Sequence, residues 1–391
     1  MAEKRRVAIT GLGVVSPVGI GRSAFWQGLL APQPEGVRSV NDFDPSTCYD
    51  DPKAIRRADR FEQFSVCAAK EALAQSGPLD ADPDRIGVLV GTGIGGAHTH
   101  EDQTLVRAEK GDRRVSPFTV PMMMANAGAA AVSIAHGFRG PCESLSTACA
   151  TGTHSIGTAA RWIQWGLCDA VVAGGTEASM TPIAIAGFSN MRALSKSGVS
   201  RPFDASRDGF VLAEGAALFV LEEWDRAAAR GATILGEVLG SASLADAHHI
   251  TAPAPGGLGA IRCMERAILD AGLRSEDIVH INAHGTSTAL NDAAEAEGIS
   301  KMFGFPGPIV TSIKGVTGHS LGAAGALEAA AVVLSMQEGL IPPTDGLENV
   351  DPELAKIDLV QKDPRAWKPG PSLSNSFGFG GHNGTLVIGP A

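Results

Sequence analysis

Hydrophobic positions along the chain fall into two alternating kinds of segment. Short runs rich in Val, Ile and Leu are typical of buried strands, and longer Ala-rich runs have the spacing of helices. The predicted strands cover residues 6–15, 85–90, 169–173, 210–221 (a pair around Glu214-Gly215), 233–241, 278–282, 309–313, 372–376 and 384–388. The predicted helices cover residues 61–75, 154–165, 224–230, 257–271 and 321–337. This alternation predicts an α/β fold with buried parallel strands.

The pattern occurs twice. Each half contains a strand, a Gly turn and an unusually Ala/Gly-rich helix, at 148–160 in the first half and 318–331 in the second. Small residues let helices approach a sheet closely, so we expect these two helices to be central and buried. We infer an internal duplication with its seam near 225–235, which gives halves of residues 1–230 and 231–391. Because no Pro/Ser linker marks the seam, the halves should form one rigid body.

Composition narrows the class of protein. The chain has 391 residues, of which 44% are hydrophobic and 19% charged, so a large core is possible. The net charge of -10 gives no basic footprint for nucleic acid, and no apolar run is long enough to span a membrane. Five arginines could still form a local basic patch for an acidic partner such as a carrier protein: Arg56, Arg57, Arg60, Arg113 and Arg114. The alternative is that they are ordinary surface charges.

The six cysteines show no paired framework spacing and no Cys-x-x-Cys, which favours a reducing compartment and hence a cytoplasmic location. Lys4-Arg5-Arg6 precedes an apolar stretch, as in a signal peptide. That stretch contains Gly11, Gly13 and Pro17, and it is interpreted as the first strand instead.

Cys149 is the leading candidate for a nucleophile. It lies in Ser146-Thr147-Ala148-Cys149-Ala150-Thr151-Gly152, at the start of a predicted helix. Small neighbours would let a substrate approach, and the free N–H groups of a helix N-terminus favour the thiolate. The alternative is that Cys149 is simply a small buried hydrophobic residue.

His284 and His319 each follow a predicted strand of the second half. Ligands of layered α/β folds bind beyond the carboxyl ends of strands, so Cys149 and the two imidazoles could converge there. Structural histidines and a zinc set are the alternatives, but the three residues are scattered singly, and we expect no metal. The nearest local metal-like cluster is His98-x-His100 with Glu101 and Asp102, and surface clusters of this kind are common without an ion.

Three Gly-rich runs, at 11–13, 91–96 and 378–381, partly resemble nucleotide-binding turns. None has the complete fingerprint of strand, Gly-x-Gly-x-x-Gly, helix and downstream acid. All three are interpreted as backbone turns.

A set of short motifs runs through the whole chain: Thr147-Ala148-Cys149, Arg201-Pro202-Phe203-Asp204, Arg207-Asp208-Gly209-Phe210, His284-Gly285-Thr286-Ser287-Thr288, Lys314, Gly318-His319 and Asn375-Ser376-Phe377-Gly378-Phe379-Gly380-Gly381. In this order and spacing they resemble the β-ketoacyl-acyl-carrier-protein synthases of the elongating, synthase I/II-like type in the thiolase superfamily. The resemblance implies a thiolase-like fold of two duplicated α/β halves in five αβαβα layers.

The same resemblance implies a decarboxylative Claisen condensation, as in fatty acid elongation. An acyl group on Cys149 would react with malonyl-acyl-carrier protein to give 3-oxoacyl-carrier protein and CO2. Substrates would arrive on the 4'-phosphopantetheine of the carrier protein, and no other cofactor is expected. The alternative is a ketosynthase subunit of a polyketide or polyene system, paired with a chain-length factor. A homodimer is expected, and a heterodimer stays open.

The resemblance also assigns roles to residues. His284 and His319 would donate hydrogen bonds to the enolate oxygen, with Lys314 and Glu328 orienting them. Backbone N–H groups of Cys149 and Phe379 would form the oxyanion hole, and Phe379 would gate the acyl pocket. The substrate-binding residues would be Thr286, Thr288, Phe377 and His100, and Glu295 would be a family acid or the partner of a structural salt bridge.

Some positions depart from the family pattern. His100 stands where the pocket floor is usually aliphatic, so it would disfavour a long saturated acyl tail or hydrogen-bond a polar or polyunsaturated one. Residues 122–127 stand where dimers share the pocket wall, and plain dimer packing is the preferred interpretation. His382 replaces the commoner Thr after the last Gly run.

Other functions fit the residues less well. A non-catalytic chain-length partner would lack Cys149. A thiolase would need a second cysteine near the C-terminus, but none follows Cys263. A chalcone-synthase-like enzyme would use Asn where this chain has His319, and a carrier-free acyl-binding module would never condense its acyl group.

Overall fold

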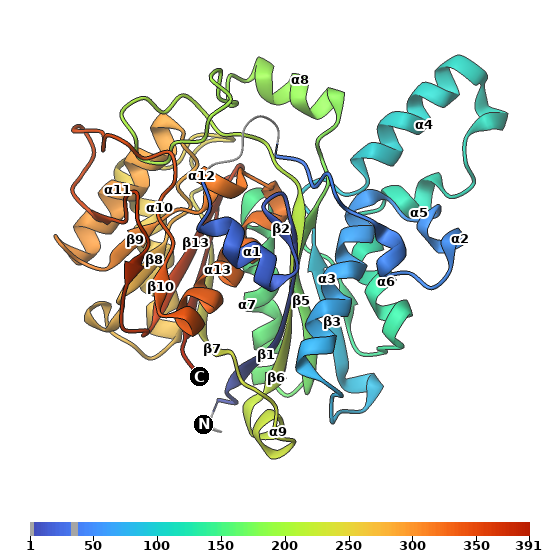
Figure 1. Ribbon diagram of the computed structural model, residues 1–391, viewed down its shortest axis with the longest axis horizontal. Helices are drawn as coiled ribbons and strands as arrows, with labels where there is room; N and C mark the ends of the chain where they lie inside the picture. Colours follow the sequence, from blue (N-terminus) through green and yellow to red (C-terminus); the bar gives the residue numbers. More distant parts are fainter. Residues whose placement is uncertain (1–3, 33–37) are drawn as a thin grey trace.

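The computed structural model describes residues 4–32 and 38–391. Its main sheet runs in the order β11-β9-β8-β13-β14-β7-β1-β6-β5-β3-β4, with β2 added beside β1 (Figure 1). The N-terminal strands are β1 (Val7–Ser16), β2 (Gly19–Ile20), β3 (Ile86–Gly91), β4 (Cys142–Glu143), β5 (Ala170–Glu177) and β6 (Gly215–Glu223). The C-terminal strands are β7 (Gly236–Ala245), β8 (His280–Asn282), β9 (Ile309–Thr311), β11 (Asp358–Leu359), β13 (Ser372–Gly378) and β14 (His382–Gly389).

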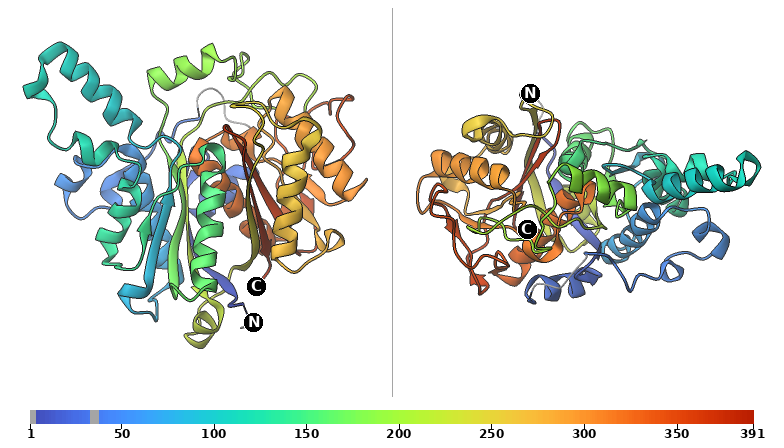
Figure 2. Two further views of the ribbon diagram at one scale, coloured as in Figure 1. Left: turned by 180° about the vertical axis from the view of Figure 1, so that it is seen from behind. Right: turned by 90° about the horizontal axis from the view of Figure 1, so that it is seen from above.

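The helices divide this sheet into layers. Helices α3 (Arg60–Ser76) and α6 (Ala127–His136) cover the outer face of its N-terminal part, and α10 (Leu258–Asp270) and α11 (Ala289–Phe303) lie outside its C-terminal part. Helices α7 (Thr151–Gln164) and α13 (Ala324–Glu338) lie between the two parts, as Figures 1 and 2 show. The predicted five-layer α/β/α/β/α fold is therefore confirmed.

The central helices are buried because their residues are small. All of α13 from Ala324 to Met336 is buried. A Cβ added at Gly152 would lie 2.6 Å from the backbone nitrogen of Ala326, so only glycine permits this approach of α7 to α13. The contact brings together the short turns that precede the two helices, η4 (Ala148–Ala150) and η7 (Leu321–Ala323).

Two expectations about the sheet were wrong. The sheet is mixed, because β1, β6, β7 and β14 pair antiparallel while β3, β5, β8 and β9 make parallel pairs. Residues 210–221 do not form two strands: only β6 is regular. The residues before it make isolated bridges instead, one of which joins Leu212 to His319.

The first Gly-rich run is not a turn. Gly11 and Gly13 lie inside β1, where an added Cβ would stand 2.1 Å from the Ala72 oxygen and 1.9 Å from the Ala68 oxygen. Both glycines let α3 lie directly on the strand. The residues next to a glycine do not show whether it lies in a turn or in a strand that a helix packs against.

Several elements were not predicted. Helix α4 (Ala97–Lys110) projects from the body at the upper right of Figure 1, followed by α5 (Thr119–Met123), and α8 (Pro182–Asn190) lies at the top. The other elements that were not predicted include α1 (Arg22–Leu29), α2 (Pro52–Ile55), α12 (Lys314–Thr317), β10 (Leu340–Ile341) and β12 (Arg365–Ala366). Helix α9 (Trp224–Ala229) lies where residues 224–230 were predicted to be helical. Within the two described ranges, no helix combines the length and hydropathy needed to cross a bilayer.

Cys48 and Cys67 form a disulfide that ties the segment before α2 to α3. The cysteine spacing, which shows no paired framework, did not predict this bond. The bond depends on how this segment folds back on α3, which cysteine spacing does not encode. Cys142, Cys149, Cys168 and Cys263 are free thiols.

Candidate active site

The turn that carries Cys149 is strained and tightly enclosed. Ala148 has a φ of 49°, in the left-handed region that non-glycine residues rarely adopt. Opposite the turn, a Cβ at Gly378 would lie 3.0 Å from the Cys149 nitrogen and 3.1 Å from the Thr147 oxygen. A strained turn held by its surroundings is typical of a residue presented for function.

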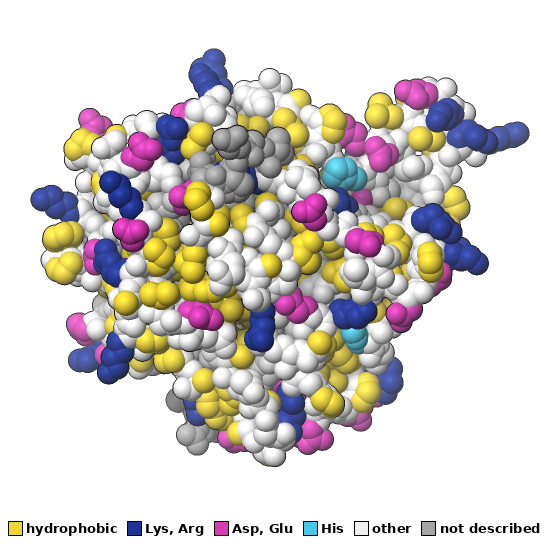
Figure 3. Space-filling model, in the orientation of Figure 1, with side chains coloured by type: hydrophobic (Ala, Val, Ile, Leu, Met, Phe, Trp, Pro, Cys, Tyr) yellow, Lys and Arg dark blue, Asp and Glu magenta, His cyan; other side chains and the backbone are white. Residues whose placement is uncertain are grey.

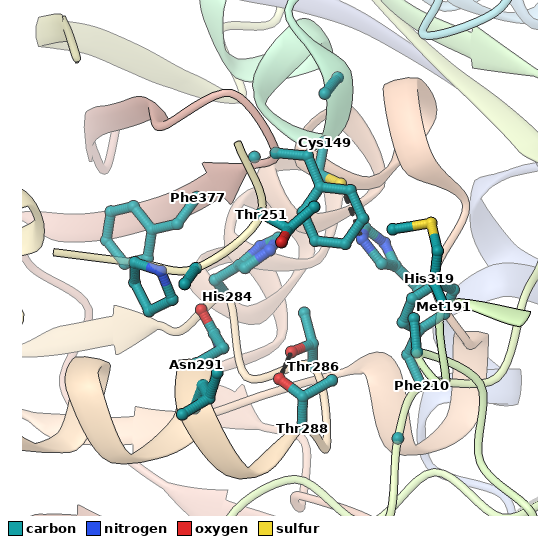
Figure 4. A pocket seen from close by; sticks show the side chains of 18 of the residues that line it. Cys149, Met191, Phe210, Thr251, His284, Thr286, Thr288, Asn291, His319 and Phe377 are labelled. Carbon is teal, nitrogen blue, oxygen red and sulfur yellow. Dashed lines mark hydrogen bonds between the residues drawn. The ribbon is translucent and has the colours of Figure 1, made fainter. Parts of the chain in front are cut away.

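Cys149, His284 and His319 meet in one cavity (Figure 4). The Cys149 sulfur and one ring nitrogen of each histidine lie within 4.8 Å of one another. His319 Nε2 is 3.1 Å from the Cys149 sulfur, and the two imidazole rings are 5.4 Å apart and nearly perpendicular. The predicted convergence of three distant segments is thus what the structure shows.

The cavity has a volume of about 460 Å³. The residues that line it include four to which the family resemblance gives a substrate or gating role: Thr286, Thr288, Phe377 and Phe379. The hydroxyls of the two threonines lie 2.9 Å apart. His100 is not brought to this cavity, since it lies exposed on α4 and the pocket floor was predicted from sequence position alone.

Lys314 fixes the tautomer and the charge of the His284 ring. Its buried ammonium pairs with Glu328, donates to the His284 backbone oxygen at 2.6 Å, and lies 3.3 Å from Nδ1 of that ring. An ammonium has only donors, so Nδ1 accepts and the proton of the neutral ring is on Nε2. Burial and the Lys314 charge hold the pKa of His284 well below its usual range, which keeps the ring neutral.

This protonation pattern bears on the zinc alternative. An imidazole that carries its proton on Nε2 can only donate from that nitrogen, whereas a metal ligand needs the nitrogen bare. The Lys314 contact therefore makes His284 suited to stabilising an oxyanion. Elsewhere, Glu101 accepts from the Ile183 N–H at the start of α8 (3.3 Å), and the side chains of residues 98–102 form no ligand group.

His319 is held from two sides. Its backbone N–H donates to the Val211 oxygen at 2.7 Å, and its ring stands edge-on against Phe210 at 5.1 Å. Burial, and secondly the charge of Lys314, lowers the pKa of His319 well below its usual range. Both imidazoles are therefore neutral near pH 7.

The Cys149 thiol is protonated at rest. Burial raises its pKa to about 11, although the Lys314 charge and the Phe379 N–H act in the opposite direction. The expectation that the helix N-terminus favours the thiolate is not met. Burial also raises the pKa values of the Cys168 and Cys263 thiols to about 11, so position rather than acidity distinguishes Cys149.

The thiol pKa gives a direct prediction. The second-order rate of Cys149 alkylation by iodoacetamide should rise about tenfold per pH unit between pH 7 and 9.5, because only the growing thiolate fraction reacts. Peptide mass spectrometry separates Cys149 from the other thiols. A rate that levels off near pH 7 would contradict the prediction and indicate a thiolate–imidazolium pair.

Glu295 has a different role from the salt bridge considered for it. The carboxylate is fully buried and accepts the backbone N–H groups of His284 and Gly285, both at 2.8 Å. No salt bridge to it occurs among the described residues. Glu295 therefore anchors the turn that carries His284.

One buried acid beside the cavity, Glu177, was not predicted from the sequence. Glu177, at the end of β5, accepts from the N–H groups of Gly93 (2.7 Å) and Gly322 (3.0 Å) and from the Ser179 hydroxyl. It thereby joins the cavity loop at Gly93 to the turn before α13. An acid two residues after the buried run ending in Gly174-Gly175 was the available signal.

A five-layer α/β fold whose central helices bring a cysteine to two neutral histidines defines the class of thiolase-like condensing enzymes. The chain belongs to the β-ketoacyl synthase family: residues 34–227 match the family's N-terminal domain and residues 235–348 its C-terminal domain. The predicted resemblance is thus confirmed.

Named relatives agree with this assignment. The chain is 44% identical to a 3-oxoacyl-[acyl-carrier-protein] synthase 2 of Synechocystis over 99% of this chain and 98% of that protein. Among solved structures it is similar to the ishigamide ketosynthase/chain length factor (TM-score 0.93, 31% identity, all of both chains). It is also similar to the type II polyketide ketosynthase AntDE in complex with its acyl-carrier protein AntF (TM-score 0.89, 29% identity, all of both chains).

Proposed function

We propose that this chain is a 3-oxoacyl-[acyl-carrier-protein] synthase that elongates acyl chains by decarboxylative condensation with malonyl-acyl-carrier protein. The observation that carries the proposal is the 3.1 Å contact between the Cys149 sulfur and His319, with a ring nitrogen of His284 within 4.8 Å of both. Identity of 44% over the full chain to a synthase of that name supports it. The polyketide alternative is not favoured, since the polyketide-type structures are less similar in sequence.

The first half-reaction is acyl transfer. The Cys149 sulfur attacks the thioester carbonyl of the acyl-carrier protein, and the thiol proton ends on the departing pantetheine sulfur. The oxygen of the tetrahedral intermediate is held by the backbone N–H groups of Cys149 and Phe379. The Phe379 N–H already acts on the Cys149 sulfur in the free protein, which supports this placement.

The second half-reaction begins when malonyl-carrier protein loses CO2. The electron pair of the broken C–C bond forms an enolate, whose oxygen accepts from Nε2–H of His284 and of His319. The enolate carbon attacks the acyl-Cys149 carbonyl, and collapse of the intermediate expels the Cys149 thiolate. The thiolate is reprotonated by solvent, and 3-oxoacyl-carrier protein leaves.

The carrier protein is proposed as the partner, with its pantetheine arm along Thr286 and Thr288. Figure 3 shows Lys and Arg side chains along the right-hand edge of the molecule, over α2 and toward the tip of α4. Arg56, Arg57, Arg113 and Arg114 are exposed there. Arg60 is different, because it pairs with buried Glu214 (2.7 Å) and serves the fold.

A dimer is also proposed. Strand β4 is one of the two edge strands of the main sheet, and its residues are exposed. Near it, apolar side chains of α5 and α6 are open to solvent, with Ile134 81% and Val120 58% exposed. A second copy covering this surface would bury them, in agreement with the dimer-packing interpretation of residues 122–127. Native mass spectrometry of the isolated chain distinguishes the two kinds of dimer. A mass of two copies indicates a homodimer, whereas a single copy favours a heterodimer with a chain-length factor.

Two further expectations stay predictions. No cofactor beyond carrier-borne phosphopantetheine is proposed, because the thiol proton passes to the departing pantetheine sulfur and solvent reprotonates the Cys149 thiolate at the end of the cycle. The cytoplasmic location rested on unpaired cysteines, and the Cys48–Cys67 bond weakens that premise.

The proposed function is tested by reconstitution. Octanoyl-carrier protein should acylate Cys149, seen as a mass increase on its peptide, and adding malonyl-carrier protein should then release CO2 and 3-oxodecanoyl-carrier protein. Reversing charge in an Arg56→Glu, Arg57→Glu variant should raise KM about tenfold for the carrier-borne substrate and leave a pantetheine thioester unaffected. Acylation without condensation would instead favour an acyl-binding module.

A further inference from the structure

A third buried histidine lies behind the nucleophile turn, outside the cavity lining. His154 ends the first turn of α7 and is 6% exposed. Its Nδ1 lies 2.9 Å from the Thr147 hydroxyl, and its Nε2 lies 3.1 Å from the Asn383 backbone oxygen on β14. A Cβ at Gly384 would stand 3.0 Å from the ring, so β14 is shaped to receive it.

The two contacts fix the direction of both hydrogen bonds. A carbonyl oxygen only accepts, so the proton of the His154 ring is on Nε2. Burial lowers the pKa of His154, with the charges of His382 and Arg161 acting in the same direction, and the ring is neutral. Nδ1 is then a bare acceptor, and the Thr147 hydroxyl donates to it.

Thr147 is the residue before the strained Ala148. The backbone N–H of Thr147 donates to the Thr151 hydroxyl at 2.8 Å, and that hydroxyl donates to the Ala148 oxygen at 2.7 Å. These bonds lie within the turn itself. The His154 contact is of another kind, because it fastens the turn to β14, the strand that follows the Phe379 loop.

We propose that His154 is a positioning residue for acyl transfer. By accepting from Thr147 and donating to Asn383, it holds the strained turn against β14, so that the sulfur and N–H of Cys149 stay aligned with the Phe379 N–H. This inference rests on the proposed role of Cys149 as nucleophile.

The same link extends to the cavity mouth. The Asn383 side chain donates to Asp246 at 2.7 Å, and the Asp246 N–H donates to the Gly381 oxygen at 2.9 Å. Asn383, Asp246 and Gly381 all line the cavity. His154 thus ties the nucleophile turn to the residues beside the predicted gate.

The test removes the hydroxyl on which His154 acts and keeps the imidazole. Thr147→Val has nearly the same shape, and it should slow both Cys149 acylation from octanoyl-carrier protein and its alkylation by iodoacetamide about tenfold at 25 °C. Thr147→Ser keeps the hydroxyl and should restore both rates to within about threefold. Thermal unfolding of each variant is measured in parallel.

A Cys149→Gln background shows whether the effect of Thr147→Val is confined to acyl transfer. In a Cys149→Gln protein, Thr147→Val should not change malonyl-carrier protein decarboxylation, because that step uses His284 and His319. A Thr147→Val protein that unfolds at lower temperature yet alkylates at the unsubstituted rate would overturn the inference and leave His154 a purely structural role. Failure of the proposed function is distinguishable, since the unsubstituted protein would then be alkylated but never acylated.

Discussion

Replacing Cys149 by alanine is expected to abolish both acylation and condensation. The thiol is the acyl acceptor of the proposed reaction, and no other free thiol borders the cavity among the described residues. The measurement is intact-mass detection of the acyl-enzyme together with release of 3-oxoacyl-carrier protein. Cys263→Ala is the matched control, because that thiol is also buried and burial raises its pKa to about 11 as well. Condensation by Cys149→Ala would refute the assignment of the nucleophile.

Cys149→Gln separates the two half-reactions. The glutamine carbonyl can occupy the place of the acyl-enzyme carbonyl, so this variant should still decarboxylate malonyl-carrier protein without forming product. Within that background, His284→Ala or His319→Ala should each lower CO2 release by about 10²–10³-fold, the usual cost of removing one oxyanion donor. Decarboxylation that persists in both double variants would show that the imidazoles do not serve the enolate.

Replacing Lys314 by methionine is expected to have the largest effect on stability. Lys314 and Glu328 are each 1% exposed and paired with each other, and removing one partner of a buried pair costs about 3–5 kcal/mol of the free energy of unfolding. Condensation should also be lost, because His284 loses the ammonium that fixes its tautomer. Urea unfolding and the reconstituted assay measure the two effects.

The double variant Lys314→Met, Glu328→Leu separates these effects. It removes both charges, so unfolding free energy should return to within about 1–2 kcal/mol of the original while activity stays lost. Recovery of activity in the double variant would contradict the positioning role of Lys314.

The pH dependence of the single variant has a definite sign. Burial already raises the pKa of Glu328 to about 7 against the opposing Lys314 charge, and without Lys314 it rises further. The folded Lys314→Met protein then binds more protons than the unfolded chain above the ordinary value of 4.5. Its stability should therefore fall as the pH is raised from about 5 to 8. An unfolding free energy independent of pH in this window would exclude an unpaired buried carboxyl.

Local patterns were sufficient for much of the fold. Residues 61–75 and 257–271 have helical spacing, and the structure places α3 and α10 there. Residues 97–110 and 182–190 were missed, because α4 and α8 expose most of their surface and bury no apolar stripe that periodicity could reveal. Residues 210–214 read as a strand, yet their partners are single residues of distant segments.

The residues of the candidate site also fall into those that a local motif marks and those that only the fold identifies. Cys149, His284, His319 and Lys314 are recognisable because each stands in a short motif after a strand. His154 and Glu177 act through hydrogen bonds to segments at least 84 residues away in the sequence, and nothing local marks those partners. Glu295 acts through the backbone N–H groups of His284 and Gly285, which only the fold of that turn brings to it. His100 was assigned from its equivalent position in the family pattern, and in this chain it lies outside the cavity lining.

The sequence by itself determined the alternation of strands and helices, the two small-residue helices and the identity of the reactive side chains, because these depend on neighbours a few residues apart. The tertiary structure decided which of those side chains meet and in what protonation state. That decision depends on the close stacking of α7 against α13 between the two parts of the sheet, which buries Cys149 beside His319 and sets Lys314 against His284 and Glu328. Burial at that junction, a property of the assembled layers, keeps the thiol protonated and both imidazoles neutral.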